Sequence, residues 1–203
     1  MKRTSILLKR IDKIDKLEGK IVISVIGTHK GVGVTHMAIL LANYFNKWLN
    51  KQTAFIEYGA RNEIIYLQEE YENNLDRQFK LDGVTYYKNV HEKDMGNIMC
   101  GNYQCIILDL GTDLSKGRNE FLRSDKKIII GSKSQWKKYQ LQKFLNEVSE
   151  EHKGSFTYIL PFAKDKEIRT LIKEYDETFY SFPFEPSPFA ISAKTVETLQ
   201  KIF

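Results

Sequence analysis

Apolar runs of strand length alternate along this chain with segments in which apolar residues recur at helical spacing. Seven runs after Gly19 consist largely of β-branched and other apolar residues, which is typical of strands covered on both faces in a parallel sheet. These predicted strands span residues 21–26, 53–57, 84–87, 105–109, 127–131, 156–160 and 178–182. The alternation predicts an α/β fold, a doubly wound, mainly parallel sheet of about seven strands with helices on both faces.

Two segments carry the clearest helical pattern. The first follows the strand at 21–26 and gathers its large apolar side chains on one stripe, formed by Met37, Leu40, Leu41, Tyr44, Phe45, Trp48 and Leu49. The second covers about residues 135–152, and we expect it to stop at Gly154. A proline-containing stretch, residues 182–189, is predicted to lead from the last strand into a C-terminal helix.

Length and composition set the domain organisation. The 203 residues, 42% of them hydrophobic, suffice for one well-buried domain and are few for two, so we expect a single domain over residues 20–203. No apolar run is long enough to cross a membrane, and the charged N-terminus lacks the apolar centre of a secretory signal, which predicts a cytoplasmic protein. Cys105 is expected to lie buried in a strand, and neither it nor Cys100 has the neighbours of a zinc site.

The first 19 residues form a basic amphipathic leader. Residues 1–20 carry a net charge of +4 of the chain's total of +5, so the remainder is nearly neutral and we do not expect nucleic acid as a partner. Within the leader, apolar residues recur at helical spacing, namely Leu7, Ile11, Ile14 and Leu17. Such a segment can contact a membrane surface or an acidic partner, or it can fold onto the domain with its charges in solvent.

A glycine-containing loop joins the first strand directly to the first helix. This arrangement presents backbone N–H groups to phosphate, helped by the helix N-terminus. In the spacing of the phosphate-binding motif G-x-x-x-x-G-K-[ST], the matching segment runs from Thr28 to Thr35. Gly33 and Thr35 fit the motif, Thr28 replaces its first glycine, and Val34 stands at the position of the phosphate-binding lysine.

Polar residues follow several predicted strands at the edge of the sheet where ligands bind in open α/β folds. The strand at 105–109 ends in Asp109, as a Walker B position requires, with a carboxylate placed to hold the water shell of Mg²⁺. Many strands end in Asp because this residue favours turns. A strand-ending Asp therefore indicates a Mg²⁺ site only when a phosphate-type loop accompanies it. Glu57 ends the second strand, and Phe162 follows the sixth.

These motifs resemble the ParA/MinD-like branch of P-loop ATPases, and within it the degenerate members near the CpaE/TadZ pilus-localisation proteins. The resemblance covers about residues 20–190 and lies in Lys30-Gly31-Val32-Gly33-Val34-Thr35, Ala54-Phe55-Ile56-Glu57 and the segment 103–112. It implies a P-loop NTPase-like domain that binds ATP and Mg²⁺, in many members as a nucleotide-bridged homodimer, and that positions a protein assembly.

The resemblance also implies site roles. Thr35 and Asp109 would hold Mg²⁺, Glu57 and Asp109 would serve catalysis, and Phe162 or Phe184 would bracket the adenine. The nucleotide would lie against the loop and the helix start, formed by His29, Lys30, Gly31, Val32, Gly33, Val34, Thr35 and His36. For His36, a partly exposed position without a ligand is an equally good interpretation.

Three departures from the family pattern favour binding over turnover. Val34 removes one lysine of K-G-G-x-G-K-[ST], His29 replaces the other, with Lys30 one residue away, and Glu57 replaces an aspartate. A charged contact to phosphate contributes roughly 1.5–3 kcal/mol, so the loss of one weakens binding about tenfold or more and hydrolysis further. We therefore expect a nucleotide-binding protein with little or no ATPase activity.

Two other function classes stay open. Gly27, Gly31 and Gly33 also match the loop spacing of short-chain dehydrogenases, which this chain further resembles in Glu57 and in a Tyr-x-x-x-Lys pair, Tyr139 and Lys143. There Tyr139 would be the general acid for NAD(P)-dependent chemistry. A scaffold that binds no nucleotide and acts only through protein contacts is the third hypothesis.

Overall fold

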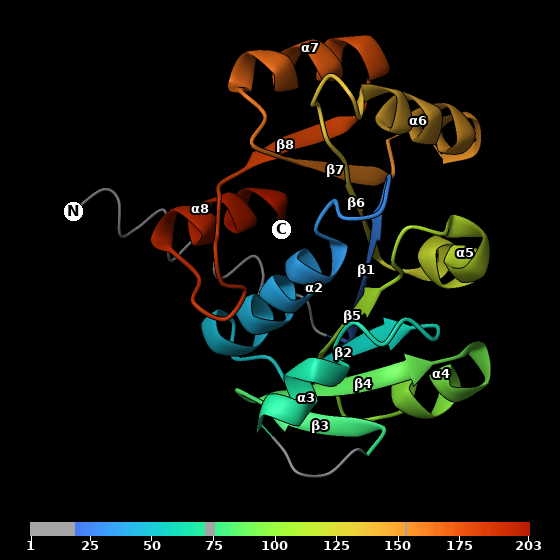
Figure 1. Cartoon of the computed structure of the whole chain (residues 1–203), viewed down its shortest axis with the longest axis vertical. Helices are drawn as coiled ribbons and strands as arrows, with labels where there is room; N and C mark the ends of the chain where they lie inside the picture. The colour runs from blue at the N-terminus through green and yellow to red at the C-terminus, as the bar shows by residue number, and fades with distance from the viewer. Residues whose placement is uncertain (1–18, 72–75, 153) are drawn as a thin grey trace.

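The computed structural model describes residues 19–71, 76–152 and 154–203. Its centre is an eight-stranded sheet in the order β3-β4-β2-β5-β1-β6-β7-β8 (Figure 1). The strands are β1 (Ile21–Gly27), β2 (Thr53–Tyr58), β3 (Gln78–Leu81), β4 (Val84–Val90), β5 (Cys105–Asp109), β6 (Lys126–Ile130), β7 (Phe156–Pro161) and β8 (Thr178–Phe182). All neighbouring strands are parallel except β3 and β4. The predicted doubly wound α/β fold is confirmed.

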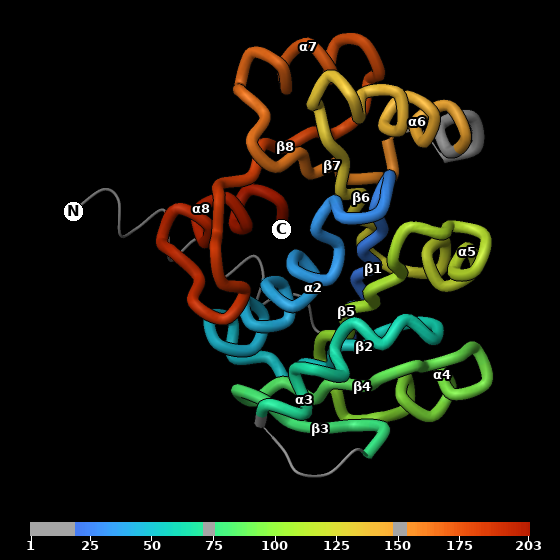
Figure 2. Tube along the Cα trace, in the orientation of Figure 1, coloured from blue at the N-terminus to red at the C-terminus, as the bar shows by residue number. Residues whose placement is uncertain are grey.

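Helices cover both faces of this sheet. They are α2 (Val34–Asn43), continued by the π-helical turn η1 (Tyr44–Trp48), and α3 (Ile65–Tyr71), α4 (Glu92–Met99), α5 (Leu114–Arg123), α6 (Lys138–His152), α7 (Asp165–Tyr175) and α8 (Ala193–Ile202). The tube view shows α2 and α8 on one side of β1, and α4, α5 and α6 on the other (Figure 2). The helix at 138–152 and the C-terminal helix both agree with the sequence pattern.

The two faces of the sheet have separate hydrophobic cores. One contains Leu40 of α2, Ile107 of β5 and Leu199 of α8, and the other contains Phe121 of α5, Leu145 of α6 and Ile129 of β6. Because strands inside the sheet are covered on both faces, all five residues of β5 are buried, Cys105 among them, as expected from its apolar run. This rigid centre fixes the positions of the loops at the carboxyl ends of the strands.

The structure differs from the sequence pattern in two details. The sheet has an eighth strand, β3, which pairs antiparallel with β4 through a turn at Asp82 and Gly83, both at positive φ. Trp48 is 53% exposed and does not belong to the buried stripe of the first helix. The π-helical turn η1 widens the helix over its last five residues, so the spacing that would have buried Trp48 no longer holds.

The basic leader predicted over residues 1–19 lies outside the described residues except for Gly19. Among the residues that the structure describes, none of the helices combines the length and the apolar character that a membrane span requires.

Candidate functional site

The loop of residues 28–33 leaves β1 at its carboxyl end and enters α2. Its start is fixed by two backbone hydrogen bonds, from Gly27 N–H to the carbonyl oxygen of Gly111 at 2.8 Å and from Thr28 N–H to that of Ile130 at 2.9 Å. Gly31 and Gly33 have φ values of 79° and 97°, which L-residues with a side chain rarely adopt. The two glycines thus allow the tight path that turns the first N–H groups of α2 toward one open space.

Val34, at the lysine position of the motif, is an apolar part of the loop's support. It is buried and belongs to the core beneath α2. A Cβ atom on Gly27 would lie 2.5 Å from Cγ2 of Val34 and 2.6 Å from Cγ1 of Val32, so both valines pack closely over this glycine. The position therefore supplies packing, and no positive charge, to the loop.

Thr35 and Asp109 meet at the head of α2. The Thr35 hydroxyl donates a hydrogen bond to Oδ2 of Asp109 at 2.6 Å, and Gly111 N–H donates to Oδ1 at 3.0 Å. Asp109 is fully buried at the end of β5, directly between Val25 of β1 and Glu57 of β2 in the strand register. The parallel pairing of β1 with β5 thus brings together Thr35 and Asp109, which the sequence predicted for one Mg²⁺ site.

Glu57 is also fully buried, at the end of β2 beside Asp109. Its Oε1 accepts a hydrogen bond from Glu63 N–H at 2.6 Å, while Oε2 has no hydrogen-bond partner among the described residues. Burial raises the pKa of Glu57, and the backbone hydrogen bond from Glu63 and the positive charge of Arg61 act in the opposite direction. The carboxyl group is thus held by the turn after β2, and it does not line the open space described next.

An open cavity of about 560 Å³ lies in front of the loop. Residues from three turns line it, namely Lys30, Gly31, Gly33, Val34, Thr35 and His36 of the loop and helix start, Arg61 and Glu63 after β2, and Gly111 and Thr112 after β5. Lys30 is exposed at this cavity. The structure thus gathers most of the predicted loop residues around one space.

His29 does not line this cavity. Its Nδ1 shares a hydrogen bond with the Thr28 hydroxyl at 3.0 Å. Burial and the nearby charge of Lys137 lower the pKa of His29, which favours a neutral ring. The residue at the first lysine position therefore offers no positive charge to the cavity.

An apolar hollow of about 300 Å³ continues from the loop toward the ends of β7 and β8. Gly31, Val32 and His36 form one wall, and Phe162 and Phe184 form part of the opposite one. The two phenylalanine rings are 74% and 69% exposed, and their centroids lie 5.9 Å apart. A pair of exposed aromatic rings beside a phosphate-type loop is suited to stacking on a planar base.

Arg61 also lines the cavity, although no sequence motif indicated it. Its Nη2 lies 2.9 Å from Oδ1 of Asp109 and also donates to the carbonyl oxygen of Asp109 at 2.9 Å. Arg61 stands in no motif, and only the pairing of β2 with β5 brings it to Asp109. A lone basic residue four positions after a strand that ends in an acid was the available signal.

The donor chemistry at Thr35 and Asp109 suits Mg²⁺, which prefers hydroxyl, carboxylate and water oxygens. Both Asp109 oxygens already accept hydrogen bonds, however, and Arg61 supplies a positive charge at Oδ1. The described residues contain no cluster of three or more His, Cys, Asp or Glu side chains that would hold a metal ion by itself. A metal at this place would therefore depend on Thr35, Asp109 and the oxygens of a bound phosphate.

The Tyr139 and Lys143 pair lies elsewhere. Both residues line a separate hollow between α6 and Tyr175 of α7, and Lys143 faces Glu147 at 3.6 Å. Neither residue lines the cavity at Thr35 or the hollow beside Phe162. This placement gives no support to a dehydrogenase site.

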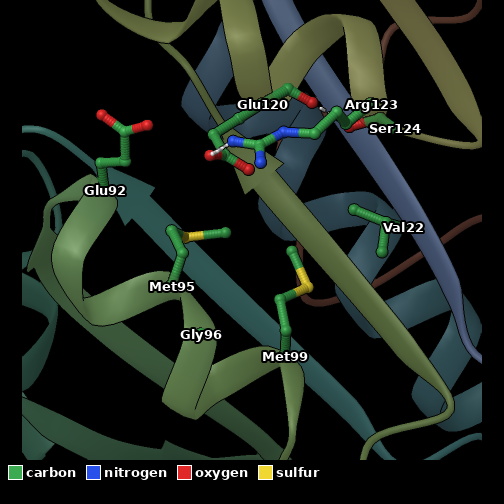
Figure 3. Close-up of a pocket in the computed structure, with 8 residues that line it drawn as sticks. All are labelled: Val22, Glu92, Met95, Gly96, Met99, Glu120, Arg123 and Ser124. Carbon is green, nitrogen blue, oxygen red and sulfur yellow. Dashed lines mark hydrogen bonds and ion pairs between the residues drawn. The ribbon is translucent and has the colours of Figure 1, made fainter.

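A further hollow, of about 360 Å³, lies between α4 and α5 (Figure 3). Met95 and Met99 of α4 project into it, with Met99 nearer to Val22, and Arg123 of α5 pairs with Glu120 at 2.5 Å. Its lining residues include none from the glycine loop. This hollow is therefore separate from the cavity at Thr35.

Comparison with known proteins places the fold. No protein-family model and no curated protein matches the sequence. Among solved structures, a plasmid partition protein from Borrelia burgdorferi bound to AMPPNP aligns with a TM-score of 0.65 and 16% identity over 91% of this chain and 97% of its own.

Two further solved structures have the same architecture. MinD in the MinC:MinD cell division complex of Aquifex aeolicus aligns with a TM-score of 0.68 and 16% identity over 90% of this chain and 95% of its own. A ParA family ATPase from Chlorobium tepidum aligns with a TM-score of 0.64 and 14% identity over 90% and 97%. The chain thus has the fold of the ParA/MinD-type P-loop ATPases.

Proposed function

We propose that this protein binds ATP in the cavity at the head of α2, hydrolyses it little or not at all, and acts as a positioning or regulatory scaffold for a protein assembly. The observation that carries the proposal is the hydrogen bond from Thr35 to Asp109 at 2.6 Å, formed beside an open cavity that the glycine loop lines. A hydroxyl at a helix start and a carboxylate at a strand end are the two groups that a P-loop site requires for Mg²⁺.

Nucleotide binding draws on three features of the site. The N–H groups at the start of α2 and the helix dipole favour a polyphosphate. Phe162 and Phe184 flank the adjoining apolar hollow, where they can bracket an adenine ring. Lys30, exposed at the cavity, is the loop's own cation for the phosphates.

Two residues near the expected phosphate position, Val34 and Glu57, favour weak ATP hydrolysis. Val34 is buried where the family's loop has a lysine, so one cation that would stabilise transition-state charge is missing. Glu57 is enclosed by the turn at Glu63 and does not line the cavity, so it is poorly placed to activate a water there.

The scaffold role is proposed by analogy with proteins of the same fold. One similar protein was solved bound to AMPPNP and another in a complex with its partner MinC. By analogy we assign to this chain a nucleotide-bridged homodimer and a protein partner, with residues 1–20 as a contact for a membrane surface or an acidic partner. A relation to the CpaE/TadZ branch belongs to the same proposal.

Calorimetric titration of the full chain with AMPPNP and Mg²⁺ tests the binding step, and phosphate release from ATP tests the turnover step. We expect saturable binding of one nucleotide per chain and phosphate release no faster than in a blank without protein. Rapid ATP hydrolysis would contradict the weak-turnover part. The absence of binding to AMPPNP, ATP and ADP would contradict the whole proposal and favour a scaffold without a nucleotide.

A further inference from the structure

Arg61 is held firmly over the end of β5. Besides its two contacts to Asp109, its Nε donates to the carbonyl oxygen of Tyr58 at 3.4 Å, and its own N–H donates to the carbonyl oxygen of Gly59 at 3.1 Å. The side chain is only 24% exposed. The turn after β2 and the carboxylate of β5 therefore fix the guanidinium from two sides.

Gly111 makes room for this guanidinium. A Cβ atom at Gly111 would lie 3.1 Å from both Cδ and Nη1 of Arg61 and 3.3 Å from its Cζ. The planar group thus lies against the bare backbone of the residue whose N–H binds Asp109. A side chain at position 111 would push Arg61 away from the carboxylate.

The charges at this point require a cation. Glu57 and Asp109 are fully buried neighbours on paired strands, and a buried carboxylate without a counter-charge is strongly unfavourable. The lysine position of the loop holds Val34, and the exposed Lys30 makes no hydrogen bond or ion pair with either carboxylate among the described residues. Arg61 provides the positive charge in direct contact with the Walker-B-type carboxylate.

The donors of Arg61 are not all used. Nε and Nη2 make the contacts given above, whereas Nη1 has no hydrogen-bond partner within the described part of the chain. Arg61 lines the cavity in front of Thr35. An arginine has five N–H donors in a planar fork, so it can hold a carboxylate and still donate to a phosphate oxygen.

We propose that Arg61 is the resident cation of the nucleotide site, that it takes the charge-balancing place of Mg²⁺ at Asp109, and that nucleotide affinity in this protein is therefore nearly independent of Mg²⁺. This inference rests on the proposed nucleotide binding and specifies its cation. Arg61 and Mg²⁺ compete for Asp109, because the contacts of Arg61 and Thr35 already occupy both carboxylate oxygens and two cations at one carboxylate repel each other.

The test is calorimetric titration of the full chain with ADP, once in excess EDTA and once in Mg²⁺. For the unchanged protein we expect dissociation constants within about threefold of each other. Arg61→Gln keeps an amide donor but removes the charge, so we expect its affinity to fall about tenfold or more in EDTA and to recover in part with Mg²⁺. Arg61→Lys, which keeps the charge, is expected to remain close to the unchanged protein in EDTA.

Arg77→Gln is the matched control. Its guanidinium is 84% exposed and pairs with Asp94 at 3.7 Å, so this variant should bind ADP as the unchanged protein does in both buffers. Melting of each variant without ligand, followed by circular dichroism, checks that it folds. The double variant Arg61→Gln/Asp109→Asn removes the charge pair together and provides a folded background if Arg61→Gln alone does not fold.

A direct metal titration separates the inference from nucleotide binding. With Mn²⁺ as a paramagnetic probe and no nucleotide, Arg61→Gln should bind the ion more tightly than the unchanged protein does. ADP binding to the unchanged protein that is lost in EDTA, or an equal response of Arg61→Gln and Arg77→Gln, would overturn the inference and leave the proposed function intact. Failure of ADP and ATP to bind in either buffer would overturn both.

Discussion

The hydroxyl of Thr35 donates to the carboxylate of Asp109 across 74 residues of sequence, at 2.6 Å. Thr35→Val keeps the shape of the side chain and removes the hydroxyl, and Asp109→Asn keeps the size of the side chain, removes its charge and replaces one acceptor oxygen by an NH₂ donor. Both variants should weaken AMPPNP binding, as measured by calorimetry, because Thr35→Val removes a hydroxyl at the head of α2 and Asp109→Asn removes the charge that holds Arg61 at the cavity. Thr170→Val on the exposed face of α7 is the control and should bind normally.

For Thr35→Val and Asp109→Asn, an effect on nucleotide binding must be distinguished from an effect on stability. If either variant melts far below the unchanged protein, its loss of binding has a structural cause, so the melting temperature without ligand must be measured alongside. Normal AMPPNP affinity in both variants, with Thr170→Val unchanged, would show that the head of α2 is not the phosphate site.

Replacement of Val34 by lysine should restore the positive charge that the loop lacks. Val34→Lys places an ammonium group at the cavity wall, where its long side chain can reach solvent from a buried stem. We expect AMPPNP affinity to rise about tenfold or more, since a charged contact to phosphate is gained. Without nucleotide, the same variant should melt at a lower temperature because an apolar core contact is lost.

Val34→Met is the matched variant for that experiment, because it lengthens the side chain without adding charge. Equal affinities of the lysine and methionine variants would contradict an electrostatic gain. A rise in ATP hydrolysis in the lysine variant alone, measured by phosphate release, would further support the assignment of position 34.

Gly27 should tolerate no side chain. An alanine there would bring Cβ to 2.5 Å from Val34 and 2.6 Å from Val32, so the loop must shift. We expect Gly27→Ala to lower the free energy of unfolding by about 1–3 kcal/mol in urea denaturation. Gly96→Ala on α4 is the control, since a Cβ there meets nothing within 4 Å and alanine favours a helix by roughly 1 kcal/mol. A loss of stability at Gly96 equal to that at Gly27 would contradict the packing argument.

The central part of the fold could be predicted because its signals are local. The inner strands β1 and β5 are nearly continuous apolar runs, and burial on both faces leaves little else that such runs can form. The strand β3 was missed because it has only four residues, two of them exposed and polar, at the edge of the sheet. Its signal was the Asp82-Gly83 pair, a common two-residue hairpin turn.

The site residues that belong to a sequence motif could be predicted, because the motif fixes their spacing along the chain. Thr35 and Asp109 come from such motifs, and their contact follows from the pairing of β1 with β5. Arg61 could not be predicted in the same way, because its contact with Asp109 depends on the turn that begins at Tyr58 and on the bare backbone of Gly111. Both are features of three-dimensional packing without a sequence signature of their own.

Glu57 predicts a dependence of stability on pH. Burial raises its folded-state pKa above the ordinary value of 4.5, so between these two pKa values the folded protein holds a proton that the unfolded chain has lost. This group's contribution to stability is full below about pH 4.5 and is lost as the pH rises through the folded-state pKa. Glu57→Gln cannot ionise and can still accept the hydrogen bond from Glu63, so it should melt above the unchanged protein at pH 7.

The gap between the two melting temperatures should shrink as the pH falls toward 4 and should be constant above the folded-state pKa. Thermal melts of both proteins from pH 4 to pH 8 measure it. A variant that melts lower than the unchanged protein at pH 7 would show instead that the attraction between Glu57 and Arg61 outweighs the cost of burial.

Phe162 and Phe184 should determine affinity for the base and leave the phosphates unaffected. Their exposed rings lie 5.9 Å apart at the apolar hollow next to the loop. Stacking on an aromatic ring contributes about 1–3 kcal/mol per base, so Phe162→Ala/Phe184→Ala should weaken ADP binding by roughly 5- to 150-fold. Binding of inorganic tripolyphosphate should stay the same, because it has no base. Tyr66→Ala, which removes a 74% exposed ring on α3, is the control and should alter neither ligand. An equal loss of affinity for ADP and tripolyphosphate would show that the two rings stabilise the loop and do not bind the base. An unchanged ADP affinity would show that the base does not bind at the ends of β7 and β8.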